Sequence, residues 1–241
     1  MNRLLMTAKI SHLSRRRYGV CVMLLATPLL LVSSAYADNI SIGFQEPGTN
    51  GGAITTEATG SGALSLPPIS YGTFNVNQAN AQDFVVLAPP GQLNSQVLDI
   101  STSTAGTLTI WVTAQGLSYT GAQDFVSSFA VNTLSGSIIG ITESTYLSTT
   151  DTLYGGTLLD AALFANIGTK GPDTTSGTTS GTYSVTEQYV IFDTGGKVGN
   201  DNITIDLSAS PVPEPASLGL LGVGLLGMVA LMRKVRRTTA H

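Results

Sequence analysis

The sequence predicts an all-β domain, an antiparallel β-sandwich of jelly-roll or immunoglobulin-like type, flanked by an N-terminal signal peptide and a C-terminal transmembrane helix. Apolar and polar residues alternate with a period of two in residues 107–114, and again in 183–187 and 203–207. Clusters of Gly, Pro, Asn and Ser separate these segments, and no long helical period occurs between residues 38 and 210. Half-polar sheets without helices bury their apolar faces against one another, which favours a sandwich.

The predicted strands follow the chain in order, and there are about ten of them. Besides the three alternating segments, we expect strands at 40–44, 71–76, 84–87, 96–100, 125–131, 138–146 and 158–164. The last of these also fits one or two helical turns. Two stretches, Gly48 to Gly62 and Pro172 to Thr182, are typical of mobile loops because Gly, Thr and Ser dominate them.

The N-terminus, residues 1–37, has the order of an export signal. A basic segment through Arg17 precedes an apolar segment from Val20 to Val32, and Ala35-Tyr36-Ala37 supplies the small residues that a signal peptidase requires. The apolar segment spans about 13 residues, fewer than the roughly 20 that cross a bilayer. We therefore expect export through the Sec translocon and cleavage before Asp38.

The C-terminus, residues 211–237, combines three features in order. Residues 212–215 are Val212, Pro213, Glu214 and Pro215, residues 216–232 form an apolar segment, and residues 233–237 contain Arg233, Lys234, Arg236 and Arg237. The prolines keep the backbone extended and accessible to a protease. The apolar segment is just long enough to span a bilayer as a helix, and the basic cluster stays on the cytoplasmic side.

These tail features together resemble the PEP-CTERM sorting signal of Gram-negative bacteria. The resemblance covers Val212 to Arg237 and no more of the chain. It implies that an exosortase in the inner membrane recognises the tail, cuts near the motif, and releases the protein or transfers it to the cell surface. It also implies an association with exopolysaccharide and biofilm matrix. The alternative is a permanent membrane anchor that is not processed.

Charge and composition exclude several classes of function for residues 38–210. This segment contains fourteen carboxylates and two lysines, a formal charge of −12. Nucleic acid is therefore an unsuitable partner, since it is bound by clustered cations. The only cysteine, Cys21, and both histidines, His12 and His241, fall outside the segment, which excludes disulfides and catalysis by a Ser-His-Asp or Cys-His site.

A few residues remain as candidate binding sites. Asp193 and Asp201 lie in a loop rich in oxygen ligands and are weak calcium candidates, against an ordinary hairpin turn; no other metal or cofactor is predicted. Trp111 falls on the polar face of its strand and Tyr119 follows it, so either residue is a candidate for stacking on a sugar ring. The alternative, which we favour, is that a second sheet covers Trp111.

The sequence therefore predicts an exported surface or extracellular-matrix protein that is not an enzyme. Its predicted partners are the Sec translocon, signal peptidase, an exosortase, the inner membrane during sorting, and a polysaccharide. The alternative function is a carbohydrate-active enzyme that uses paired carboxylates for glycoside hydrolysis.

Overall fold

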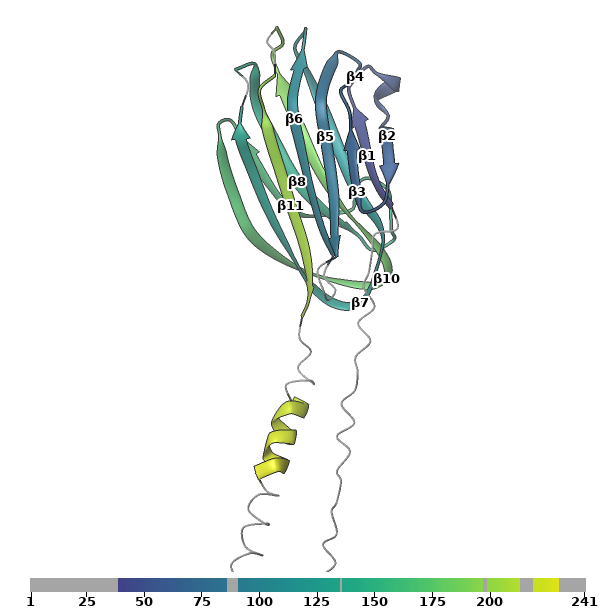
Figure 1. The fold of residues 1–241 in the computed structure, drawn as a ribbon, viewed down its shortest axis with the longest axis vertical. Coiled ribbons are helices and arrows are strands. Elements are labelled where there is room, and N and C mark those ends of the chain that lie inside the picture. Colours follow the sequence, from purple (N-terminus) through teal and green to yellow (C-terminus); the bar gives the residue numbers. More distant parts are fainter. Residues whose placement is uncertain (1–38, 86–90, 135, 197–198, 213–218, 230–241) are drawn as a thin grey trace, which may run out of the picture. The chain divides into compact units, whose positions relative to one another are not determined.

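The computed structural model describes residues 39–85, 91–134, 136–196, 199–212 and 219–229 (Figure 1). Several predicted processing residues lie outside the described residues: Ala35, Ala37, Pro213, Glu214, Pro215, Arg233, Lys234, Arg236 and Arg237. Val212, Asp193, Asp201, Trp111 and Tyr119 are described.

Eleven strands form the described fold, and every pair is antiparallel. They are β1 (Asn39–Gln45), β2 (Thr55–Gly60), β3 (Ala63–Leu66), β4 (Ile69–Tyr71), β5 (Phe74–Val85), β6 (Gly91–Thr102), β7 (Gly106–Thr133), β8 (Ile138–Ser148), β9 (Thr157–Phe164), β10 (Gly168–Asp193) and β11 (Asn202–Pro211). A single 3₁₀ turn covers Asn50–Gly52, and a helix covers residues 219–229. The all-β, antiparallel prediction is confirmed.

The strands belong to one continuous sheet in the order β3-β5-β6-β11-β7-β10-β8-β9, with β4 beside β5, and β1 joining β2 to β7. The long strands β7 and β10, of 28 and 26 residues, curve at the lower end of the domain in Figure 1. The first half of β7 pairs with β1 and with the second half of β10, whereas the second half of β7 pairs with β11 and with the first half of β10. These two strands therefore belong to both halves of the sheet.

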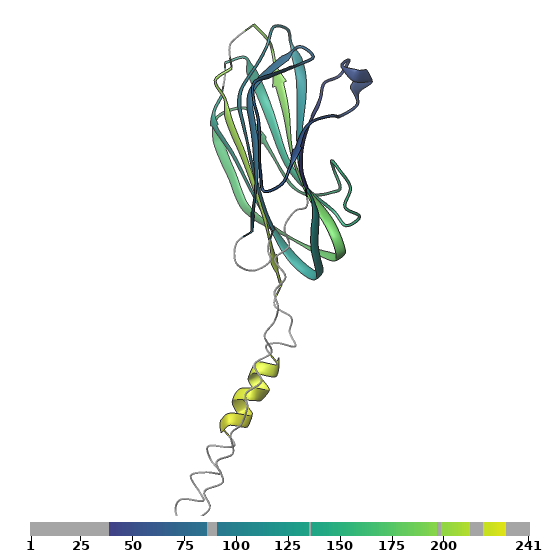
Figure 2. The ribbon, with the colours of Figure 1, turned by 45° about the vertical axis from the view of Figure 1, so that its right-hand side comes forward.

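The curved sheet folds onto itself, so its two halves become facing layers (Figure 2). Layer A contains β2, β1, the first half of β7, the second half of β10, β8 and β9; layer B contains the remaining strands and strand halves. Two strands separate β6 from β10 in the sheet order, yet the hydroxyls of Ser95 on β6 and Tyr189 on β10 are 2.6 Å apart. A finer assignment to the jelly-roll or immunoglobulin-like type stays a prediction.

The core lies between the layers and follows the period-two pattern. Ile110 and Val112 of β7 point inward together with Ile203 and Ile205 of β11, and all four are at most 1% exposed. Every buried apolar side chain in the described residues lies between positions 40 and 209. The β domain therefore contains its own core, and burial of these side chains is the main source of its stability.

Two segments predicted as loops contain regular structure. Pro172 to Thr182 belongs to β10 and pairs with β7 from Asp173 to Thr182, because the β-branched threonines fit a pleated strand and β7 supplies the partner. The interval from Gly48 to Gly62 contains the 3₁₀ turn and β2.

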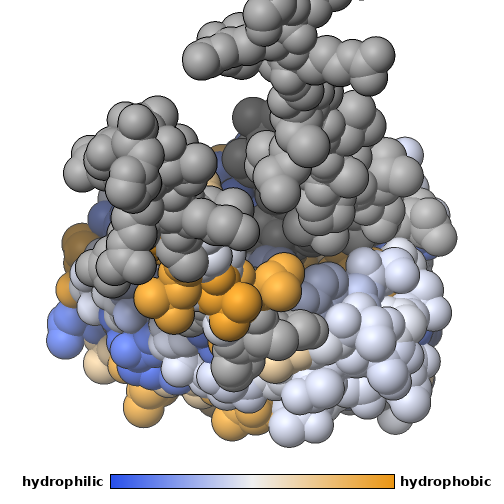
Figure 3. Space-filling view, turned by 90° about the horizontal axis from the view of Figure 1, so that it is seen from below, coloured by the Kyte–Doolittle hydropathy of each residue, from blue (hydrophilic) through white to orange (hydrophobic). Residues whose placement is uncertain are grey.

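Figure 3 views the end of the domain where β7 and β10 bend. Much of this end is pale, which means that its residues are neither strongly hydrophilic nor strongly hydrophobic.

The predicted transmembrane segment, residues 216–232, is described only in part. Within its described part, residues 219–229 are helical. None of the helices in the described residues is both long enough and apolar enough to cross a membrane.

Candidate functional site

The outer face of layer A carries a cluster of aromatic side chains. Trp111 lies on β7 between two inward-facing residues, Ile110 and Val112, so its own side chain points away from the core. Its register neighbours are Gly43 on β1 and Gln188 on β10. Trp111 is half-buried, so this residue keeps some exposed surface on the outer face.

Two tyrosines complete this outer-face aromatic cluster. The ring centroid of Trp111 is 6.2 Å from that of Tyr146 on β8 and 6.4 Å from that of Tyr154 in the loop after β8. Both distances fall in the range at which aromatic rings attract one another. Tyr146 and Tyr154 are also half-buried, so the three rings share one partly open surface.

The loop between β8 and β9 holds Tyr154 in place. Tyr154 has a φ of 58°, a left-handed conformation that a bulky residue adopts only when its surroundings enforce it. Its backbone N–H donates to the Thr113 hydroxyl at 3.3 Å, and the next N–H, of Gly155, donates to the Thr186 hydroxyl at 3.4 Å. Thr113 and Thr186 have no exposed surface. These two hydroxyls hold the loop against layer A, and the loop in turn covers them.

A glycine on β1 makes room for the tyrosine ring. A Cβ atom at Gly43 would lie 2.6 Å from both Cζ and Oη of Tyr154, closer than side chains pack. The Tyr154 hydroxyl donates to Thr56 on β2 at 2.9 Å, and burial raises its pKa above the ordinary range. The phenol therefore stays protonated, and β1 and β2 fix the ring at both ends.

Amide groups and a hollow accompany the rings. The indole N–H of Trp111 donates to the Gln45 amide oxygen at 3.4 Å, and the Tyr146 hydroxyl donates to the Gln188 amide oxygen at 2.8 Å. A hollow of about 370 Å³ borders the cluster and is lined by Gln45, Pro47, Gly52, Thr107 and Thr109. Rings, amides and an adjacent hollow are the usual elements of a small-molecule site.

The two aromatic residues singled out from the sequence have different positions. No second sheet covers Trp111 in the described structure; the side chains at its ring are Tyr146 and Tyr154 on the same outer face. The preferred prediction for Trp111 was therefore wrong. Tyr119 lies farther along β7, opposite Gly181 and partly buried against the core, and is not among the ring partners of Trp111.

A pair of glutamates lies in the core, and neither was singled out from the sequence. Glu143 on β8 and Glu187 on β10 both have 0% exposure, and Glu187 accepts a hydrogen bond from Ser95 across the layers. Burial raises the pKa of Glu143 to about 8 and that of Glu187 well above its ordinary range. Burial thus favours the neutral form of both carboxyls, and with no exposed surface they do not contact a substrate in this conformation.

The two calcium candidates each accept a hydrogen bond from a backbone N–H group. Oδ1 of Asp193 accepts the N–H of Gly195 at 2.7 Å, and Oδ2 of Asp201 accepts the N–H of Ile100 at 2.7 Å. Burial raises the pKa of Asp201 to about 6. In the described part of the chain, no three or more His, Cys, Asp or Glu side chains are grouped to hold a metal ion. Both carboxylates thus support backbone N–H groups, and calcium binding at this loop stays a prediction.

Sequence reasoning found part of this site and missed part. Trp111 was found because it is the one large ring on the polar face of an alternating strand. Tyr146 carried a similar signal, since it precedes the inward-facing Leu147 on β8 and therefore faces outward. Tyr154 gave none, because a loop residue reaches the cluster only through long-range folding. Glu143 gave none either, because nothing in its strand marks a glutamate as inward-facing.

Structural comparisons find distant similarities for the β domain. The adhesin domain of Epf from Streptococcus pyogenes is 10% identical with a TM-score of 0.36, and the match covers 73% of this chain and 60% of that domain. A structure described as CBM4 is 14% identical with a TM-score of 0.23, and the match covers 62% of this chain and 86% of that chain. The chain thus spans 60% of the length of the adhesin domain. No curated protein matches the sequence.

The tail gives a definite match. Val212, its first predicted residue, donates its N–H to the Ala122 carbonyl at 3.0 Å, so the tail begins where β11 leaves the sheet. Residues 211–237 match the family described as the PEP-CTERM protein-sorting motif, which confirms the resemblance inferred from the sequence. This chain therefore carries, at its C-terminal tail, a PEP-CTERM protein-sorting motif.

Proposed function

We propose that this chain is a non-enzymatic protein that is exported, processed by an exosortase, and delivered to the cell surface or extracellular matrix of a Gram-negative bacterium. The observation that carries the proposal is the PEP-CTERM motif at residues 211–237, which directly follows the last strand of a folded β domain. A signal peptide at 1–37 and a transmembrane segment at 216–232 complete the proposed route: Sec export, signal-peptidase cleavage, transient residence in the inner membrane, and exosortase cutting near Glu214.

At the surface, the β domain is proposed to associate with exopolysaccharide in a biofilm matrix. The outer-face aromatic cluster, which combines three rings with amide groups, supports association with a polymer. The carbohydrate-active enzyme alternative receives no support from Glu143 and Glu187, because a substrate does not reach carboxyls of 0% exposure. A reducing-sugar assay with the exported protein tests this alternative, and release of reducing ends would establish it.

The intact mass of the protein recovered from outside its host tests the sorting proposal. We expect a species that begins at Asp38 and ends near Glu214; extra mass would indicate transfer to a surface molecule. Changing Pro213, Glu214 and Pro215 together to alanine should leave the tail attached and the protein in the membrane fraction. Ser210→Ala is the matched control, since this exposed residue of β11 lies just outside residues 211–237. A wild-type protein that keeps residues 216–241 in the membrane would contradict exosortase sorting.

A further inference from the structure

We infer that the outer-face aromatic cluster is a binding site for an uncharged polysaccharide, with Trp111 as its central stacking residue. This inference deepens the proposed function and rests on it, because it names the site and the chemical class of polymer with which the exported domain associates. The three rings supply the apolar surface. The flanking amides and the hollow beside Gln45 supply hydrogen bonds and space.

The rings suit the C–H faces of sugar rings. Trp111 points away from the core and is flanked by Tyr146 and Tyr154 at 6.2 and 6.4 Å. The interplanar angles of 39° and 48° show that the three rings do not form one flat plane. Tilted rings fit a twisted chain better than a flat crystalline polymer surface, so the expected ligand is a soluble glycan.

The polar groups suit sugar hydroxyls. Gln188 uses only its amide oxygen for the bond from Tyr146, so that bond leaves both amide hydrogens for another acceptor. Gln45 spans the rings and the hollow: its oxygen accepts from Trp111, its nitrogen donates to the Gly52 carbonyl at 2.8 Å, and its side chain lines the hollow. Amides at both ends of the indole match a ligand that offers hydroxyls on either side of an apolar ring face.

The site is held in shape before any ligand arrives. The left-handed conformation of Tyr154 is fixed by the hydroxyls of Thr113 and Thr186, and Asp151 accepts the N–H of Gly116 at 2.9 Å from the same loop. Such strained positions persist where the surrounding structure enforces them, and they concentrate at binding sites. A preorganised site loses less entropy on binding than a mobile one.

Charge selects the class of polysaccharide. Lys170 is the only basic residue among those that the structure describes, and its ammonium already pairs with Asp160 at 2.6 Å and Asp173 at 3.2 Å. Glu57 lies near enough to Tyr154 to raise the pKa of the phenol through its charge, and Asp151 belongs to the loop that carries the ring. Among the described residues, an anionic polymer would meet negative charges and no unpaired cation, so the expected ligand is uncharged.

The test uses the β domain, residues 38–212, whose described core is self-contained. Trp111 is the only tryptophan in the chain, so its fluorescence reports occupancy of the site directly. Titration with laminarin, dextran, xyloglucan and cello-oligosaccharides is expected to give a saturable change with at least one of them, whereas alginate gives none. In affinity gels containing the responding glycan, Trp111→Ala should weaken binding by about tenfold, as expected for loss of a central ring contact.

Two further variants make the outcome decisive. Tyr119→Ala is the control, because this tyrosine lies elsewhere on β7, and it should bind as the wild type does. Gln188→Ala keeps the indole and should weaken binding several-fold even if Trp111→Ala does not fold. No fluorescence change with any uncharged glycan, unchanged affinity in both site variants, or stronger binding of alginate would each overturn the inference.

The sorting proposal can fail separately from the binding inference. In the native host, Trp111→Ala should still be cut at the tail and recovered outside the cell, because the substitution lies outside residues 211–237. A domain that binds glycan while the wild-type chain remains uncut in the membrane would contradict sorting alone. A chain that is sorted but unresponsive to every uncharged glycan would contradict this inference alone.

Discussion

Gly43 shows how one residue without a side chain can shape a surface made by others. Its φ is not in the left-handed region, so a larger residue would not strain the backbone φ at this position. What it provides is the space that the Tyr154 ring occupies above β1. The loop after β8 depends on this space, because the ring and its hydroxyl anchor the loop to β1 and β2.

Gly43→Ala should displace the Tyr154 ring and destabilise the domain by about 1–3 kcal/mol, the usual cost of overpacking. Thermal unfolding measures the loss, and a shift in Trp111 fluorescence reports that the neighbouring ring has moved. Gly140→Ala on β8 is the matched control, since a Cβ there would lie at an ordinary 3.6 Å from Phe192. Equal effects of the two substitutions would contradict a specific role for the space at Gly43.

Glu143 is unusual because neither of its buried carboxyl oxygens has a hydrogen-bond partner. Burial raises its pKa from 4.5 to about 8, so the folded protein keeps this proton over a range in which the unfolded chain has lost it. The free energy of unfolding falls with rising pH wherever the unfolded state binds fewer protons than the folded state. The free energy of unfolding should therefore decrease as the pH rises from 4.5 to about 8.

Glu143→Gln should reduce this pH dependence, because the amide has no proton to lose. Denaturant unfolding at several pH values across the range measures the slope for each variant. Some slope should remain, since burial also raises the pKa of Glu187. Glu57→Gln, near the surface on β2, is the control and should leave the slope unchanged. A wild-type protein whose stability is constant over this range would contradict the buried, neutral state of Glu143.

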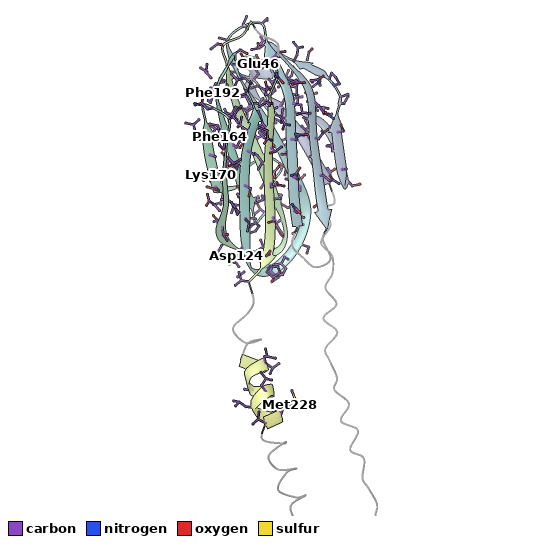
Figure 4. The ribbon with its side chains drawn as sticks, turned by 60° about the vertical axis from the view of Figure 1, so that its left-hand side comes forward. Glu46, Asp124, Phe164, Lys170, Phe192 and Met228 are labelled. Atoms are coloured by element: carbon purple, nitrogen blue, oxygen red, sulfur yellow. The ribbon has the colours of Figure 1, made fainter. Side chains whose placement is uncertain are left out.

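At the scale of elements, the free edge of β9 is closed by side chains instead of another strand. β9 is the last strand on its side of the sheet. Lys170, on β10 in layer B (Figure 4), donates to the Ala161 carbonyl of β9 at 2.9 Å and pairs with Asp160. Thr175, also on β10, donates to the Leu159 carbonyl at 3.0 Å. Unpaired strand edges invite association with other chains, and a lysine is a common means of preventing it.

Lys170→Met should therefore have two effects. The free energy of unfolding should fall by about 1 kcal/mol, a modest value because this ion pair is partly exposed. Self-association should increase with concentration, which size-exclusion chromatography measures. Asp173→Asn is the control, because it removes only the more exposed partner of Lys170, and it should remain monomeric to the same extent as the wild type. A monomeric Lys170→Met protein at all concentrations would contradict this role of the edge.

At the scale of the whole molecule, the local alternation of apolar and polar residues predicted where strands occur better than how long they are. The alternation at 107–114 and 203–207 lies in β7 and β11. The pattern did not show that 107–114 and 125–131 belong to one strand, because Leu117 to Gly121 does not alternate clearly and is held in the strand by its pairing with β10. The loop prediction for Pro172 to Thr182 was wrong for the same reason. Its residues favour a loop locally, and the strand that pairs with it, β7, lies far away in sequence.

The site was predictable in the same uneven way. The PEP-CTERM motif is contiguous, so the sequence alone revealed it. The aromatic cluster combines residues of β7, β8 and the loop after β8, and only Trp111 was visible as a candidate. The position of Tyr154 depends on Gly43, about a hundred residues earlier, and such a pairing is a property of the fold and not of any local pattern.

The position of β11 has a mechanical consequence for a protein held by its tail. The sorting motif follows β11 directly, so tension applied through the tail enters the domain along this strand. β11 lies inside the sheet between β6 and β7, and its ladder with β7 continues to Pro211. Such a pull along the strand loads two rows of hydrogen bonds in shear at once, whereas an edge strand pulled in the same direction would load only one row. In a protein tethered through this tail, both rows of hydrogen bonds would resist drag together.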